Sequence, residues 1–151
     1  MEELIPTISE IVKYGLNQNL DIVNKEKLLE EHLVKIYGLY FEIRNECDDI
    51  DYPSFEKSQF PNIRQNIESN FKNFGFYKVA ININDIYDTD ECTLSDAIDD
   101  LVDITLDLLE VKWRVESNSL NDGLRYFKFI FYAHTQQHIL GLLNFMNQIE
   151  T

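Results

Sequence analysis

The sequence predicts an all-α, single-domain bundle of four to five helices over residues 1–151, with one extended connector near residues 77–84. Three observations predict this fold. Apolar residues recur at spacings of three and four through long segments, which is the period of an amphipathic helix. The chain has only five Gly and three Pro, so few places are suited to linkers. A length of 151 residues with 44% hydrophobic content is enough for one substantial core.

Two helices are expected in the first third of the chain. Pro6 and Thr7 form a typical first-turn signal, so a short helix should cover about residues 7–17. A second helix begins near Asn24 and covers KEKLLEEHLVKIYGLYFEIRNE. Its apolar face consists of Leu29, Leu33, Ile36, Tyr40 and Ile43.

The middle of the chain contains a loop, a third helix and the connector. CDDIDYPSFEKSQ has the composition of a loop, and Pro61 then opens a helix that Gly75 ends. The segment YKVAININD alternates weakly between apolar and polar residues. Because one isolated strand cannot satisfy its own hydrogen bonds, we interpret it as an extended connector pressed on the core. An edge strand that pairs in a dimer is the alternative.

Two helices complete the predicted bundle. Thr93, followed by Asp96 three residues on, resembles a capping box, and the helix after it should run to about Val115. SNSLND is a turn. The segment GLRYFKFIFYAHTQQHILGLLNFMNQ then forms the most apolar helix, which we expect to be the central element.

Charge and composition exclude several classes of protein. A formal net charge of −14 argues against nucleic acid as a partner, because phosphate binding needs clustered Lys and Arg. No stretch approaches the roughly 18 uninterrupted apolar residues of a membrane span, and the acidic opening MEELIPTISE is unlike a signal peptide. We therefore expect no membrane partner and a cytoplasmic location. Cys47 and Cys92 stand alone and predict two reduced thiols.

A stripe of carboxylates follows one side of the fourth predicted helix. Its residues project within roughly 60° of one direction. They are Asp96, Asp99, Asp100, Asp103, Asp107 and Glu110. The stripe is either the solvated face of an amphipathic helix or a surface for a basic partner or a cation, since no Lys or Arg is interleaved.

Two histidines one turn apart lie on the apolar last helix. His134 and His138 project into a face of large apolar residues, so we expect neither ring to be solvent-exposed. A buried imidazole with an unpaired nitrogen costs about 1 to 3 kcal/mol, so a carboxylate, tyrosine, water or metal should meet them. His32 on the second helix could extend the pair to a cluster of three. The spacing lacks the glutamate of the HExxH motif, which excludes a zincin.

Two stretches resemble the signatures of a bacterial family that is described only as a domain of unknown function. DDLVDITLDL (99–108) resembles the family's DDLADIYxDL, and FKFIFYAHTQQH (127–138) resembles its WRFxFExHWGxH. GFYKV (75–79) and the Leu39-Tyr40 pair also fit, and the likeness covers roughly residues 28–148. The resemblance implies a small helical bacterial protein whose activity has no established description.

The resemblance places five polar residues at signature positions and leaves five other positions different. The matching polar residues are Asp100, Asp103, Asp107, His134 and His138. The matching apolar residues are Leu101, Ile104, Leu108, Phe129 and Phe131. The chain departs from the family's Tyr, Trp, Glu, Trp and Gly at Thr105, Phe127, Tyr132, Thr135 and Gln136.

These observations lead to one structural hypothesis and two functions. Asp103 or Asp107 should approach His134 or His138 through a charge-assisted hydrogen bond. The favoured function is a small acidic protein-binding module for a basic protein surface, in the manner of an immunity protein or antitoxin, with no cofactor. The alternative is a metal-dependent or acid-base enzyme. In that case the metal candidates are His134, His138, Asp103 and Asp107, although no metal is expected.

Overall fold

The computed structural model describes residues 2–44, 46, 48–88 and 92–149, and Cys47 lies outside the described residues. The first three helices are α1 (Leu4–Leu16), α2 (Lys25–Glu42) and α3 (Ile63–Asn70), with a short 3-10 turn η1 (Lys57–Gln59) before α3. A hairpin of β1 (Phe76–Ala80) and β2 (Cys92–Asp96) leads into α4 (Ala97–Ser117). The chain then continues through α5 (Leu120–Ile130), a π-helical turn η2 (Phe131–Thr135) and α6 (Gln136–Ile149).

The fold is mainly helical, but it is not the purely all-α bundle that the sequence predicts. With α5, η2 and α6 counted as one broken helix, the described residues contain five helices, as expected. The prediction of an extended connector near residues 77–84 is wrong in part, because Phe76–Ala80 form the paired strand β1. It pairs antiparallel with β2, with Tyr77 opposite Ser95. The partner strand lies within residues that we assigned to the start of a helix, so no pairing was expected.

The helix after the hairpin begins later than the capping-box pattern predicts. Thr93 lies in β2, and Asp96 is the actual N-cap: its side chain accepts a hydrogen bond of 3.0 Å from the backbone N–H of Ile98. An aspartate at this position satisfies one of the unpaired N–H groups of the first turn. The strand therefore passes directly into α4, and this fixes where the hairpin leaves the helical body.

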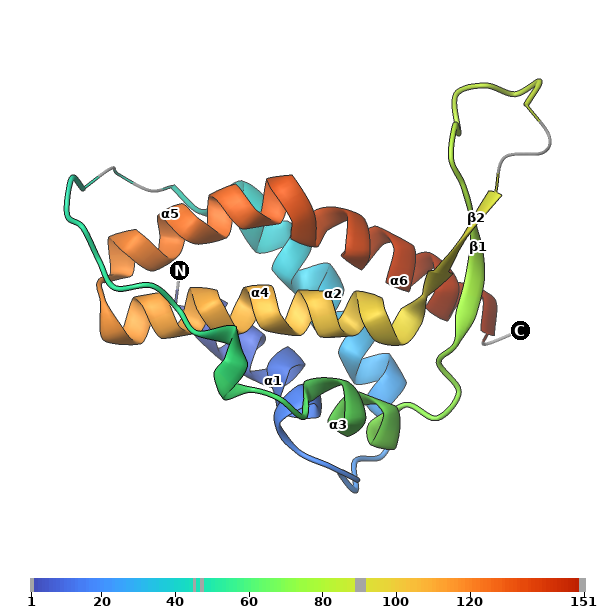
Figure 1. Ribbon diagram of the computed structural model, residues 1–151, viewed down its shortest axis with the longest axis horizontal. Coiled ribbons are helices and arrows are strands. Elements are labelled where there is room, and N and C mark those ends of the chain that lie inside the picture. The colour runs from blue at the N-terminus through green and yellow to red at the C-terminus, as the bar shows by residue number, and fades with distance from the viewer. Residues whose placement is uncertain (1, 45, 47, 89–91, 150–151) are drawn as a thin grey trace.

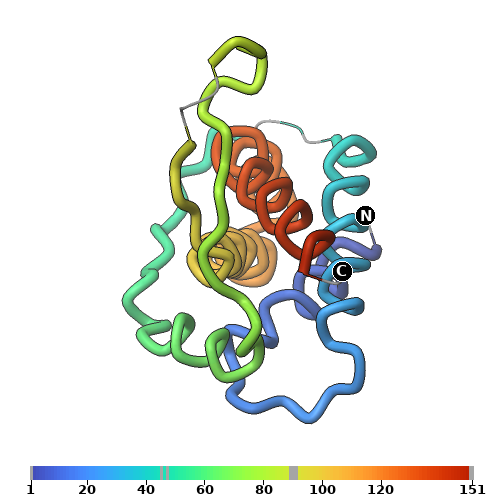
Figure 2. Tube along the Cα trace, turned by 90° about the vertical axis from the view of Figure 1, so that its right-hand side faces the viewer, coloured from blue at the N-terminus to red at the C-terminus, as the bar shows by residue number. Residues whose placement is uncertain are grey.

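Helix α4 is the central element, a place that we had expected the last helix to take. It contacts α1, α3, α5 and α6, and it lies inside the ring of other helices in the end-on view (Figure 2). In Figure 1 it runs beside α5 and α6 along the long axis of the molecule, with α1 and α3 below it. The largest fully buried side chains include Tyr14, Phe71, Phe127 and Phe131.

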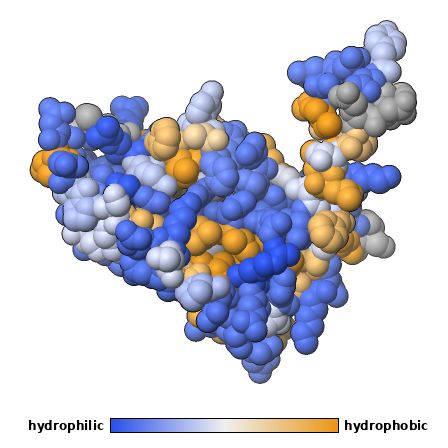
Figure 3. Space-filling view, viewed as in Figure 1, coloured by the Kyte–Doolittle hydropathy of each residue, from blue (hydrophilic) through white to orange (hydrophobic). Residues whose placement is uncertain are grey.

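The hairpin projects from the helical body (Figure 1). Figure 3 shows apolar residues along it, in contrast to the mostly hydrophilic face of the helices. The exposed apolar side chains of this segment are Phe76, Ile81, Ile83, Ile86 and Leu94. None of the helices in the described ranges is long and apolar enough to cross a membrane.

Close packing of α5 on α4 depends on a glycine. A Cβ at Gly123 would lie 2.1 Å from Val115 Cγ2 and 2.9 Å from the Val115 backbone nitrogen. Gly123→Ala should therefore destabilise the protein by about 1 to 3 kcal/mol, because the backbone of α4 cannot move away cheaply. Gly38→Ala in α2 is the control: its Cβ meets nothing within 4 Å, and it should stabilise the helix by about 0.5 to 1 kcal/mol. Urea unfolding measures the stability of both variants, and equal changes in the free energy of unfolding would contradict the close packing at Gly123.

Candidate functional site: a His–Asp cluster between α4 and the last helix

A seam of polar side chains lies between α4 and the helix formed by α5, η2 and α6. The two helices are antiparallel, so residues late in α4 pair with residues early in the last helix. Arg114 pairs with Asp122 at one end of the seam, and Asp100 pairs with His138 at the other. At the second end the seam brings together five residues that we call the His–Asp cluster. They are Asp100, Asp103, Asp107, His134 and His138.

The π-helical turn η2 sets the position of His134. Here the backbone N–H of Gln136 donates to the carbonyl of Phe131, five residues earlier, and so the turn holds one residue more than an α-helical turn. The wider turn lets two consecutive side chains reach the same carboxylate. His134 Nδ1 lies 2.8 Å from Asp107 Oδ2, and Thr135 Oγ1 donates to the same oxygen at 2.8 Å.

Each imidazole is held by its own buried aspartate. His134 Nδ1 pairs with Asp107, and His138 Nδ1 lies 2.9 Å from Asp100 Oδ1. The two aspartate side chains are only 1% and 6% exposed. An ionised carboxylate only accepts hydrogen bonds, so both Nδ1 atoms must carry the hydrogen. In the neutral rings this leaves both Nε2 atoms as acceptors.

The two Nε2 atoms face each other at 3.2 Å. Asp103 Oδ2 lies 3.6 Å from Nε2 of His138, and the three ligand atoms of His134, His138 and Asp103 all lie within 4.8 Å of one another. Two lone pairs at this separation repel, so the arrangement needs either an additional proton between the rings or a cation beside them. His134, His138 and Asp103 are thus a set of residues that could hold a cation.

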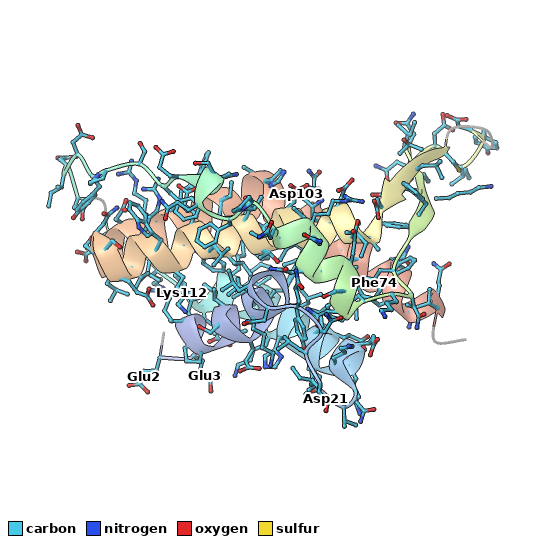
Figure 4. The ribbon with its side chains drawn as sticks, turned by 60° about the horizontal axis from the view of Figure 1, so that its bottom comes forward. Glu2, Glu3, Asp21, Phe74, Asp103 and Lys112 are labelled. Atoms are coloured by element: carbon cyan, nitrogen blue, oxygen red, sulfur yellow. The ribbon has the colours of Figure 1, made fainter. Side chains whose placement is uncertain are left out.

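One side of the cluster is accessible from solvent. The side chains of His134, His138 and Asp103 are 38%, 19% and 41% exposed. Figure 4 shows Asp103 in the first half of α4, on the side that faces away from α1. A ligand can therefore reach the two nitrogens and the Asp103 carboxylate without opening the core.

The protonation of His138 reflects this environment. The hydrogen bond to Asp100 raises its pKa, burial opposes the rise, and the charges of Asp103, Asp100 and Asp107 add to it. These carboxylates together favour the charged form of the His138 ring.

Several sequence expectations need correction here. The expectation that both rings avoid solvent is wrong for His134, because the π turn carries it to the edge of the core. The carboxylate stripe is not a solvated face along its whole length, since Asp100, Asp107 and Glu110 are buried in the seam. His32 does not join the pair: its Nδ1 lies 2.6 Å from the carbonyl of Leu28 in its own helix.

Sequence reasoning missed three residues that support the cluster. Tyr77 on β1 donates to Asp100 Oδ2 at 2.5 Å, and Thr135 donates to Asp107. Farther along the seam, Tyr126 donates to Glu110 Oε2 at 2.9 Å. Only the pairing of β1 with β2 and the π turn bring the first two into place, and neither has a local sequence signal. The GFYKV match was the one pointer to Tyr77.

Comparisons with family models, curated proteins and solved structures find no match to this chain. The resemblance to the bacterial family therefore stays a prediction, and the site is interpreted from its own geometry.

Asp107 and Asp103 should differ sharply in their effect on stability. Asp107→Asn places an amide where one buried oxygen accepts two hydrogen bonds, so we expect a loss of about 1 to 3 kcal/mol. Asp103→Asn, on the same helix but half-exposed, should change stability by less than about 0.5 kcal/mol. Urea unfolding of both variants with a chelator present is the measurement. Equal losses would mean that burial of the carboxylate does not matter.

Stability of the metal-free protein should depend on pH through His138. Its pKa in the folded protein is raised above the ordinary value for histidine, about 6.5, so its stabilising effect is complete below that pH and is lost as pH rises through the folded pKa. The difference in unfolding free energy between wild type and His138→Gln should therefore shrink as pH rises above about 6.5. His32→Gln serves as the control. A difference that grows with pH would contradict the assigned direction.

Proposed function

We propose that this chain binds one divalent transition-metal ion on His134, His138 and Asp103 and is a metal-dependent enzyme that acts through a metal-bound water. The observation that carries the proposal is the 3.2 Å separation of the two Nε2 atoms, with the Asp103 carboxylate within 4.8 Å of both. Two nitrogens at about 2.0 to 2.1 Å from a tetrahedral zinc ion are about 3.3 Å apart. The rings are thus already spaced as ligands of one ion.

The second supporting feature is the pair of buried aspartates behind the rings. Histidine ligands of metals almost always donate their other N–H to a carboxylate, carbonyl or water, which fixes the tautomer and raises the basicity of the ligand nitrogen. Asp107 and Asp100 have this relation to His134 and His138. A structural lock between helices needs one such pair, whereas two pairs that converge on one point favour a metal site.

Three ligands converge among the residues that the structure describes, and this number supports an enzyme over a structural site. Structural zinc is closed by four protein ligands, whereas catalytic zinc has three and keeps a position for water or substrate. Two histidines and one carboxylate also suit iron(II) with open positions. The half-exposed Asp103 is the ligand that must adjust to complete the set, and its side chain has room to do so.

The chemistry divides between the ion and the protein. A bound ion acts as a Lewis acid and lowers the pKa of its water toward neutrality. His134 and His138 would hold the ion, since each ring is anchored at Nδ1 by a buried aspartate. Asp103 would offset part of its charge from the solvent-facing side of the cluster.

Metal binding should require the three proposed ligands and not the third histidine. Wild type should bind one Zn²⁺ or Co²⁺ per chain, and His134→Ala, His138→Ala and Asp103→Ala should each weaken binding at least about tenfold. His32→Ala is the matched control and should bind as the wild type does. Calorimetric titration and metal analysis of purified protein measure this.

The same titration shows which part of the proposal fails. Absence of stoichiometric binding, or equal weakening by His32→Ala, would overturn the metal site. If Co²⁺ binds but its visible spectrum does not respond to added azide or imidazole, the ion has no open position. The site would then be structural and the enzyme proposal would be wrong.

The acidic protein-binding module remains a second proposal because the net charge of −14 favours a basic partner. We place it after the metal-dependent enzyme, since three of the six carboxylates of the stripe are buried and satisfied within the seam. The immunity or antitoxin-like role and the cytoplasmic location are likewise predictions from the sequence.

A further inference from the structure

The β1–β2 hairpin is joined to the helical body beside the His–Asp cluster. A two-stranded hairpin alone in water is at best marginally stable, so its position depends on contacts with the body. One backbone hydrogen bond, from the N–H of Ala97 to the carbonyl of Gly75, lies at its base. The side chain that reaches farthest into the body from β1 is Tyr77, whose ring packs on Phe145 of α6 at 5.3 Å between centroids.

The approach of Tyr77 depends on the absence of a side chain on α6. A Cβ at Gly141 would lie 2.4 Å from the Tyr77 hydroxyl oxygen. With glycine there, the hydroxyl passes over α6 and donates to Asp100 Oδ2 on α4 at 2.5 Å. The hydroxyl therefore lies where β1, α4 and α6 meet, and it also hydrogen-bonds to Ser95 of β2.

Asp100 connects this hydroxyl to a proposed metal ligand. Its Oδ2 accepts from Tyr77, and its Oδ1 accepts from Nδ1 of His138 at 2.9 Å. Burial and the hydrogen bond to Asp100 raise the pKa of Tyr77 to about 12, so the phenol keeps its hydrogen at neutral pH. The carboxylate thus has one oxygen fixed by the hairpin and the other by the histidine.

We propose that Tyr77 is a positioning residue that couples the seating of the hairpin to metal affinity at the His–Asp cluster. This inference rests on the proposed function. Metal binding needs the Nε2 lone pair of His138, and that lone pair exists only while Nδ1 carries the hydrogen and donates it to Asp100. Tyr77 holds Asp100 in the orientation that keeps this tautomer.

Coupling between the hairpin and the proposed metal site must act in both directions. If a seated hairpin raises the affinity for the ion, then the bound ion stabilises the seated hairpin by the same factor. A molecule that held the hairpin against the body, or pulled it away, would change metal affinity without touching the metal ligands. The hairpin is in this sense a regulatory element of the site.

The test compares the same chemical change at two tyrosines. Tyr77→Phe removes the hydroxyl but keeps the ring on Phe145, whereas Tyr87→Phe removes an exposed hydroxyl from the same segment. Tyr77→Phe should weaken Zn²⁺ and Co²⁺ binding about tenfold, in the range known for residues behind a metal ligand, and Tyr87→Phe should not. Added Zn²⁺ should slow amide exchange in β1 and β2 of the wild type more than in Tyr77→Phe.

A second readout needs no metal. The ring ¹⁵N shifts of His138 in the metal-free protein report its tautomer, and Tyr77→Phe should move them while Tyr87→Phe should leave them unchanged. Equal metal affinities of wild type and Tyr77→Phe, or unchanged ring shifts, would overturn the coupling. If wild type itself binds no metal, the proposed function fails, and with it the coupling to metal affinity. The ring shifts then show whether Tyr77 still positions His138.

Discussion

The burial of two aspartates between α4 and the last helix is the constraint on which the rest of the site depends. Asp100 and Asp107 are almost completely buried, and an unpaired buried carboxylate is far too costly to keep. Each is therefore surrounded by donors from other elements: His138 and Tyr77 for one, His134 and Thr135 for the other. Because the donors come from β1, η2 and α6, these pairs set the register of the two helices and the place of the hairpin together.

Buried carboxylates farther along the seam are also met by donors. Glu110 is buried and is met by Arg114 from its own helix and by Tyr126 from α5, while Asp122 accepts two hydrogen bonds from Arg114. This part of the seam is closed, since each charge has an opposite charge within reach. The part at His134 and His138 differs, because two acceptor nitrogens and the Asp103 carboxylate converge without a cation among the described residues around them. That contrast distinguishes the His–Asp cluster from the rest of the seam.

Much of the fold could be predicted from spacing alone, and the part that could not depends on contacts between distant residues. The apolar period gave the helices within a few residues of their ends, and the carboxylates and histidines one turn apart predicted that α4 and the last helix meet through polar groups. The hairpin escaped prediction because β1 has its partner twelve residues beyond its end, in a segment with the sequence of a helix start. The exposure of His134 escaped it because helical projection assumes 3.6 residues in every turn.

The π turn η2 has a consequence for how the last helix is divided. One surplus residue rotates everything after it by about 100° relative to an uninterrupted helix, so α5 and α6 face the core in different phases. Phe127 before the turn and Leu142 after it are both fully buried, and the two histidines lie between them. The turn resembles the insertion of one residue into a regular helix: it interrupts one helical turn, and it leaves the two imidazole rings at the edge of an otherwise continuous apolar surface.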